Sequence, residues 1–336
     1  MKATRLGHMP ALDGVRAVAI LLVVGYHGFV PGFGYGNHGV DVFFVLSGFL
    51  ISALIAGQFQ DGEFSRNRFY LRRAIRLMPA LLVTVVVFTP VGLIVMKDQQ
   101  TLLGAGAALL YLTPFAPTTI FDHTWTLALE EWFYLVWPLV LGKMLRDRLS
   151  LRQIALLVGI AGVTGQAFMI VQPGSLAARP STLLLGAALA MWWLDGGRIP
   201  RPQVALLGGF GSIMLGVFAG PELWGPVPYW LTAFGTVAMI GGIACDAHGF
   251  SARVLESVPM VAIGVVSYEW YLVHSPLLKL AAELWGIESG FFIGPISLAL
   301  AFGLHRALAP MQQHLRLRSS RTPGKVLPGE QSSTHD

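Results

Sequence analysis

An arginine and a histidine bracket the first strongly apolar stretch of the chain, which reads RAVAILLVVGYH from Arg16 to His27. In a helix, their separation of eleven residues turns only about 20° beyond three full turns, so both side chains share one face about 16 Å apart. A neutral imidazole can take a proton near pH 7, and ionisable groups inside apolar segments usually mark functional sites. His27 is therefore a candidate base, whereas Arg16 could instead reach an interface or pair with Asp13.

A cluster of arginines follows in the segment RFYLRRAIRLMPAL. In a helix, Arg72 and Arg76 stand at positions i and i+4, and Arg73 and Arg76 at i and i+3. Guanidinium groups gathered in this way fit phosphate oxygens. Because the sequence has no Gly-rich phosphate loop, nothing indicates a Walker or Rossmann site. The alternative is that these arginines only fix the topology of a membrane protein.

Carboxylates occur in two further apolar segments. Asp41, in GVDVFFVLSGFLIS, is expected at the level of His27, where it could orient that ring or simply complement a helix dipole. Glu130 and Glu131 lie inside HTWTLALEEWFYLVWPL. A carboxylate there needs a partner, so we expect one glutamate to face a cavity and the other a neighbouring helix. The alternative is a structural salt bridge, for instance to Arg179.

A second histidine lies late in the chain, in SYEWYLVHSPLL. At helical spacing, Ser267, Tyr271 and His274 share one face. A histidine bonded within a helix bundle is the alternative to a functional role. No trio of His, Cys or Asp has metal-ligand spacing, so we expect no metal site, and the single cysteine, Cys245, excludes an internal disulfide.

The composition indicates a membrane protein. Of the 336 residues, 54% are hydrophobic and only 12% are charged, whereas a soluble domain carries roughly 25% charged residues. The apolar sequence falls into blocks separated by short polar loops, which is typical of a polytopic helical membrane protein. The blocks cover residues 12–29, 38–57, 78–96, 101–116, 124–142, 153–171, 178–194, 203–219, 227–244, 258–284 and 291–308.

The positive charges decide the predicted topology. If block 101–116 is a re-entrant or interfacial segment, most of the 23 basic residues fall in loops on the side of the N-terminus. The positive-inside rule then favours ten crossings with both termini cytoplasmic. We therefore predict an all-α integral membrane protein of the inner membrane, with about ten transmembrane helices and one extra short segment. Residues 1–310 form the membrane domain, and residues 311–336 form a polar, disordered cytoplasmic tail.

Five segments together resemble the membrane acyltransferase family 3 proteins, which O-acylate sugars, lipids and secondary metabolites. The segments are LDGVRAVAILLVVGYH, GVDVFFVLSGFLI, FYLRRAIRLMPAL, HTWTLALEEWFYLVWPL and SYEWYLVHSPLL, and the resemblance covers about residues 10–310. It implies a bundle of about ten helices, an acyl-CoA donor that is most often acetyl-CoA, and transfer to a hydroxyl group presented from the far side of the membrane. We expect a stand-alone membrane module without an appended esterase-like domain.

The resemblance also implies roles for individual residues. The Arg-x10-His motif of the family falls on Arg16 and His27, with His27 as the catalytic histidine. The other matched positions are Arg72, Arg73 and Arg76, then Trp125, Glu130 and Tyr134, and finally His274. The sequence departs from the family pattern where Ser181 follows Arg179 in place of an acid, and at Trp132 and Val273. These departures concern the acceptor pocket more than the chemistry.

The sequence thus predicts an integral-membrane O-acyltransferase that moves an acyl group, acetyl above all, from acyl-CoA to a hydroxyl of a sugar, glycolipid or secondary metabolite. His27 is the predicted base, oriented by Asp41 or Glu130. Coenzyme A phosphates are expected at Arg16, Arg72, Arg73 and Arg76. The acceptor pocket is expected to involve Trp125, Tyr134, Arg179, Tyr271 and His274. The partners are the lipid bilayer, acyl-CoA and a carbohydrate acceptor, without nucleic acid. The alternative function is a transporter or flippase for a small polar or acylated solute.

Overall fold

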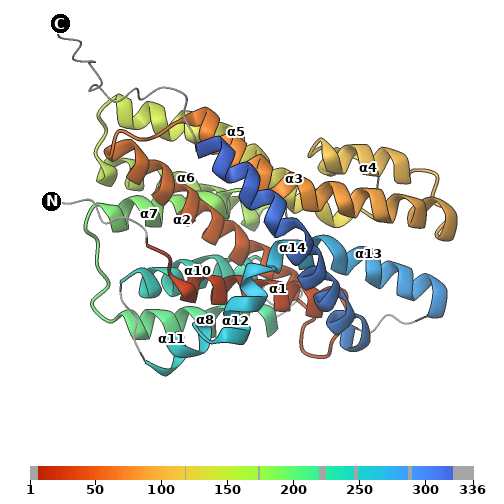
Figure 1. Ribbon diagram of the computed structural model, residues 1–336. Coiled ribbons are helices and arrows are strands. Elements are labelled where there is room, and N and C mark those ends of the chain that lie inside the picture. Colours follow the sequence, from red (N-terminus) through yellow and green to blue (C-terminus); the bar gives the residue numbers. More distant parts are fainter. Residues whose placement is uncertain are drawn as a thin grey trace, which may run out of the picture.

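The computed structural model describes residues 7–117, 119–172, 175–218, 225–245, 249–286 and 290–320. Throughout these ranges the regular structure is helical and contains no strand (Figure 1). An apolar chain in lipid must satisfy its backbone groups internally, and helices do so within one segment. The longer helices are α1 (Pro10–His27), α2 (Gly39–Gln60), α3 (Arg66–Pro90), α5 (Trp125–Arg146), α6 (Leu151–Ala167), α7 (Ser181–Leu194), α8 (Pro202–Phe218), α10 (Val227–Ala244), α13 (Ser267–Trp285) and α14 (Gly290–Ser320). The shorter helices are α4 (Thr101–Leu109), α11 (Phe250–Leu255) and α12 (Val258–Val265).

Six of the described helical spans are long and apolar enough to cross a membrane. They are Pro10–His27, Gly36–Gln60, Arg66–Val95, Leu151–Ile170, Val227–Ala244 and Phe291–Arg318. α7 and α8 are apolar but shorter, and α5 and α13, of 22 and 19 residues, carry charged side chains. The protein is therefore a multi-pass helical membrane protein, but the predicted number of about ten crossings is not confirmed. Counting these four helices as crossings would give that number.

Three predicted segments differ from the observed helices. The arginine cluster lies within α3, which begins at Arg66, whereas the sequence placed it in a loop before residue 78. The predicted crossing 258–284 is divided into α12 and α13 at Val266, where the backbone turns (φ −93°, ψ 7°). Only residues 101–109 of the segment 101–116 form an α-helix, α4, which packs against α3.

The last helix is longer than the sequence suggested. α14 continues to Ser320, past the predicted domain boundary at residue 310, so the first part of the predicted disordered tail is helical. The rest of that tail, residues 321–336, lies outside the described residues. α1 begins, and α14 ends, on the left side of Figure 1, which brings both ends of the helical region to one end of the bundle. We call this the arginine end and the opposite one the histidine end.

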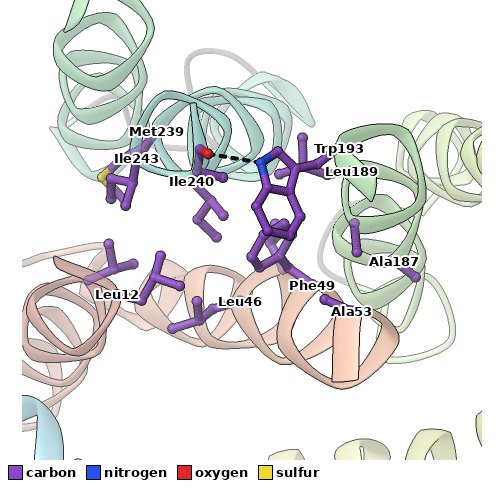
Figure 2. Close-up of a cluster of buried hydrophobic side chains, with 14 of the residues drawn as sticks. Leu12, Leu46, Phe49, Ala53, Ala187, Leu189, Trp193, Met239, Ile240 and Ile243 are labelled. Atoms are coloured by element: carbon purple, nitrogen blue, oxygen red, sulfur yellow. Dashed lines mark hydrogen bonds between the residues drawn. The ribbon is translucent and has the colours of Figure 1, made fainter. Parts of the chain in front are cut away.

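One hydrophobic core joins α1, α2, α7 and α10 (Figure 2). Phe49 of α2 lies against Trp193 of α7, with 5.9 Å between the ring centroids. The Trp193 indole N–H donates a hydrogen bond to the carbonyl oxygen of Ala244, at the end of α10, over 2.8 Å. Its polar edge is thus satisfied inside an apolar contact. This core fixes α1 and α2, which carry His27 and the walls of the site described below.

Two glycines allow α2 and α7 to pack with their backbones in contact. A Cβ atom at Gly48 would collide with the carbonyl oxygen of Leu183, and one at Gly186 with the carbonyl oxygen of Val45. Small residues at helix interfaces serve this purpose in membranes, where packing replaces the hydrophobic effect. Gly48 therefore serves close packing against α7, while its neighbour Ser47 donates a hydrogen bond to Glu130 of α5.

Candidate active site

The arginines of α3 line a cavity of about 840 Å³ at the arginine end of the bundle, which we call the arginine cavity. Its cationic side chains are Arg68, Arg72, Arg73 and Arg76 of α3 and Arg316 of α14, with His305 beside them. They lie together because α3 starts, and α14 ends, at the same end of the bundle. The predicted phosphate-binding set Arg72, Arg73 and Arg76 is therefore gathered in one place, and α14 adds a wall that the sequence did not suggest.

Arg73 is held in place by two neighbours on α5. Its Nε atom donates a hydrogen bond to Glu131 Oε1 over 2.9 Å, and the two side chains are only 16% and 20% exposed. Its guanidinium carbon lies 3.1 Å from the ring centroid of the buried Tyr134. A cation with one carboxylate and one aromatic face retains free N–H groups for a further acceptor. The salt bridge raised as the alternative for this glutamate pair is present at Glu131, and its partner is Arg73 and not Arg179.

A second, smaller pocket of about 140 Å³ lies next to the arginine cavity, and we call it the inner pocket. Ile51, Arg73 and Arg76 line both spaces, so the two adjoin at these side chains. Deeper in the inner pocket, Ser47 donates a hydrogen bond to Glu130 Oε1 over 2.7 Å. Glu130 is thus the glutamate of the pair that faces a cavity, and its hydrogen-bond partner is Ser47 and not His27.

Arg16 also lines the inner pocket, and it pairs with Asp13 on the same helix face. Asp13 in turn lies 3.0 Å from the ring of His8. The alternative raised from the sequence, a local pair with Asp13, is thus present. It does not withdraw the Arg16 side chain from the pocket wall, where Arg16 adds a third guanidinium to those of Arg73 and Arg76.

The break between α12 and α13 shapes the far wall of the inner pocket. Ser267, Tyr268 and Tyr271, all on the first turns of α13, line it. Tyr271 accepts a hydrogen bond from Thr126 Oγ1 over 2.6 Å and donates one to the carbonyl oxygen of His123. None of His27, His123 and His274 lines the pocket, so the described pocket stops at this tyrosine.

Beyond Tyr271 lie three histidine rings. His27, at the end of α1, and His274, on α13, are 3.2 Å apart between Nδ1 and Nε2. His123 packs edge-on against His274, with 5.7 Å between the ring centroids. His123 and His274 are buried, while His27 is partly exposed. The sequence predicted that Asp41 or Glu130 would contact His27, but its side-chain partner in the structure is His274.

The surrounding carbonyl groups determine where the protons of these two rings lie. The His274 Nδ1 atom is 2.7 Å from the carbonyl oxygen of Tyr271, and His27 Nδ1 is 3.1 Å from that of Val23. Carbonyl oxygens only accept, so both Nδ1 atoms carry hydrogen. Neutral His274 then accepts at Nε2 from the His27 Nδ1–H group, which is shared between this nitrogen and the Val23 carbonyl oxygen. The remaining lone pair of neutral His27 is on Nε2, where it can take a proton.

Asp41 belongs to a different cluster. Its carboxylate lies 3.3 Å from Arg179 Nη1, and these two side chains are 3% and 5% exposed. The Arg179 guanidinium carbon is 5.4 Å from the ring centroids of both Trp125 and Tyr229. Buried charges need such partners. The predicted acceptor set is therefore divided, with Trp125 and Arg179 here, Tyr134 and Tyr271 at the inner pocket, and His274 at His27.

Several residues of the site were not singled out from the sequence. Thr126 and Ser47 supply hydrogen bonds, and Gln312 and Arg316 line the arginine cavity. His305 also lines that cavity and lies 2.9 Å from Glu269 Oε1. The spacing of Gln312 and Arg316, one helical turn apart, is a signal that could have been recognised if α14 had been predicted to continue.

Comparison with known proteins shows which family the chain belongs to. A family model described as an acyltransferase domain matches residues 9–306. The chain is 30% identical over 315 residues to the peptidoglycan O-acetyltransferase OatA of Listeria monocytogenes, covering 82% of this chain and 50% of that protein. It is 29% identical over 314 residues to the O-acetyltransferase OatA of Staphylococcus aureus, covering 81% of this chain and 51% of that protein.

The chain thus spans about half the length of these curated relatives. No solved structure matches it. The match to the acyltransferase domain includes the helices that carry His27, the arginines of α3, Glu130 and His274. The chain therefore belongs to the acyltransferase 3 family.

Proposed function

We propose that this protein is an O-acetyltransferase that takes an acetyl group from acetyl-CoA and transfers it to a hydroxyl group of a cell-wall or cell-surface carbohydrate. One observation carries the proposal: the arginine cavity and the inner pocket adjoin at Arg73 and Arg76, and Tyr271, which lines the inner pocket, lies next to His274 of the His27–His274 pair. The names of the relatives support the choice of acetyl and of a carbohydrate acceptor.

The donor would lie along the two adjoining spaces. Phosphates bind at guanidinium groups, so the nucleotide end of coenzyme A occupies the arginine cavity. The narrow inner pocket then receives the uncharged arm and the thioester. Ser47, Glu130 and Tyr134 line this pocket and fix the arm by hydrogen bonds and packing. A donor placed in this way brings its acetyl group toward Tyr271, one helical turn from His274.

The acceptor hydroxyl needs a base, because an alcohol is a weak nucleophile at its ordinary protonation state. His27 Nε2 takes the hydroxyl proton while the oxygen attacks the thioester carbonyl carbon. The carbon–sulfur bond then breaks, and the thiolate of coenzyme A takes up the proton that His27 holds, which returns His27 to its neutral form. His274 stabilises the imidazolium form of His27 by accepting its Nδ1–H group. The proton thus has a place on His27 during the attack.

We place the arginine end at the cytoplasm of a bacterial inner membrane, where acetyl-CoA is made, and the histidine end at the outer face. Both ends of the chain would then be cytoplasmic. The basic residues of the loops at the arginine end support this orientation through the positive-inside rule.

The proposal is tested with purified protein in detergent or nanodiscs, supplied with acetyl-CoA and an oligosaccharide of N-acetylglucosamine. We expect free coenzyme A to appear, measured with a thiol reagent, together with an acetyl ester on the oligosaccharide, measured by mass spectrometry. Release of neither product with any carbohydrate, combined with uptake of a solute into proteoliposomes, would contradict the proposal and favour a transporter.

Arg73→Gln should raise the KM for acetyl-CoA about 10- to 100-fold and change kcat little. The reason is the loss of a charged hydrogen-bond donor at the point where the two spaces meet. Because this change leaves Glu131 without its partner, the double variant Arg73→Gln, Glu131→Gln keeps the comparison free of a folding defect. Arg152→Gln, at an exposed position on α6, is the matched control. An unchanged KM in the double variant would contradict the role of Arg73.

His274→Leu should lower kcat about 10- to 100-fold, because His27 loses the acceptor that holds its Nδ1–H group. His274→Gln keeps an oxygen or nitrogen near the position of Nε2 and should recover part of this loss. The pH dependence of kcat should shift for His274→Leu, since the imidazolium form of His27 is then less stabilised. Equal activities of the two variants would show that this hydrogen bond does not act in transfer.

A further inference from the structure

An ion pair at the histidine end of the bundle lies close to the candidate base and takes no part in binding the donor. Lys279 Nζ donates one hydrogen bond to Asp122 Oδ1 over 2.7 Å and another to the carbonyl oxygen of Thr119 over 2.9 Å. The backbone N–H group of His123 donates to the same Oδ1 atom over 2.7 Å. Neither charged side chain lines the arginine cavity or the inner pocket. The pair is therefore separate from the proposed donor site.

The order of residues along α13 places this pair beyond the histidine rings. Tyr271 lines the inner pocket, and His274 follows three residues later. Lys279 lies a further five residues along the helix, which is about 7.5 Å along the helix axis. The charges of Lys279 and Asp122 are close enough to act on the ring of His27. A ligand that reaches His27 from the side opposite to the donor therefore comes close to this pair.

The pair is accessible and has hydrogen-bonding groups to spare. The side chains of Lys279 and Asp122 are 32% and 36% exposed. An ammonium group has three N–H donors, and the two bonds of Lys279 use two of them. Among the described residues, no hydrogen bond reaches the second carboxylate oxygen of Asp122, Oδ2. The pair thus offers one donor and one acceptor near His27, which suits hydroxyl groups, because a hydroxyl both donates and accepts.

The surroundings of the pair indicate the kind of ligand that it suits. Tyr26 is 37% exposed, and its ring centroid lies 5.1 Å from that of His27, so an aromatic surface stands next to the base. Ligand sites combine such apolar surfaces with a few polar groups that fix orientation. The charges of Asp122 and Lys279 are opposite and cancel. A sugar without charge can bond to both groups, whereas a charged sugar is repelled by one of them.

We infer that Asp122 and Lys279, together with Tyr26, form an acceptor subsite at the histidine end that binds an uncharged, hydroxyl-bearing sugar unit. This inference rests on the proposed function and deepens it, because it assigns the charge class of the acceptor next to the reacting hydroxyl. Asp122 Oδ2 accepts a hydrogen bond from a sugar hydroxyl, and Lys279 donates one to a hydroxyl or amide oxygen. Both residues determine specificity and take no part in proton transfer.

The test uses the intact purified protein with acetyl-CoA and an oligosaccharide of N-acetylglucosamine as acceptor. A hyaluronan oligosaccharide, whose glucuronate units carry carboxylates, is added as an inhibitor. Asp122→Asn leaves the ammonium group of Lys279 unpaired and should lower the inhibition constant of this anionic oligosaccharide about five- to tenfold. Lys279→Met leaves the carboxylate of Asp122 unpaired and should raise that constant by a similar factor. Both variants should raise the KM for the uncharged acceptor about three- to tenfold and leave the KM for acetyl-CoA unchanged.

The opposite directions of these two shifts distinguish an acceptor subsite from an ion pair that only holds the loop to α13. Loss of a purely structural pair would move the inhibition constant in the same direction in both variants, or not at all. Lys143→Met and Asp147→Asn, which break an exposed ion pair at the end of α5, are the matched controls and should change neither constant.

Two failures are distinguishable. Inhibition constants that are equal in the unmodified protein and both variants, or that move in the same direction, would overturn the inference while the transferase activity stands. If the unmodified protein releases no coenzyme A and forms no acetyl ester, the proposed function is overturned, and this inference with it.

Discussion

Replacing His27 with alanine should lower acetyl transfer about 10²- to 10⁴-fold, the usual contribution of a general base. The structure leaves His27 Nε2 as the free lone pair of the His27–His274 pair, so no other ring in that pair can replace it. The initial rate of acetyl ester formation at saturating acetyl-CoA measures the effect. The KM for acetyl-CoA should change little, because His27 does not line either of the two donor spaces.

The control for this change is His314→Ala, which removes an exposed histidine of α14 at the opposite end of the bundle. It should leave the rate unchanged. Both variants should migrate as single species on size exclusion in detergent, which separates a chemical defect from a folding defect. A His27→Ala protein with full activity would end the assignment of His27 as the base.

Replacing Asp41 with alanine should lower the free energy of unfolding by about 3–5 kcal/mol, the typical cost of breaking a buried ion pair on one side. The change leaves the guanidinium group of Arg179, which is only 4% exposed, without its carboxylate. Thermal unfolding in detergent, followed by tryptophan fluorescence, measures the loss. Asp147→Ala provides the matched control, since it removes an exposed ion pair with Lys143 that contributes about 1 kcal/mol or less.

The double variant Asp41→Ala, Arg179→Met distinguishes a structural role of Asp41 from a catalytic one. Removing both charges should recover most of the lost stability, because no buried charge is then left unpaired. If Asp41 serves only to hold Arg179, this protein should also keep the KM for acetyl-CoA. A stable double variant with a rate as low as that of His27→Ala would instead support the prediction that Asp41 orients the base.

The local features of the site were predictable from the sequence because they depend on helical spacing. Arg72, Arg73 and Arg76 fall within a little more than one turn, so any helix gathers them, and the apolar blocks mark where the helices lie. The expectation that one glutamate of the Glu130–Glu131 pair faces a cavity followed from the cost of an unpaired carboxylate in lipid. These inferences need only one segment at a time.

The pairings between helices were not predictable in this way. The sequence offers several arginines as partners for Glu131. Glu131 contacts Arg73 because this part of α5 lies next to the first turns of α3. His27 and His274 are separated by 247 residues in the sequence, so no local pattern indicates that they meet. The carboxylate of Asp41 is paired with Arg179 and not with His27. The charges of residues and their spacing along a helix can be inferred from a single sequence. Which faces of helices distant in the sequence contact each other cannot be inferred from it.

The end of the inner pocket at Tyr271 has an energetic consequence for the cell. A water-filled tube open at both ends would let protons run down the membrane potential, and each elementary charge would dissipate about 2.3 kcal/mol per 100 mV. The hydrogen-bonded contact of Tyr271 with Thr126 and His123 lies between the inner pocket and the histidine rings. We therefore expect proteoliposomes that contain the protein to hold a membrane potential between turnovers.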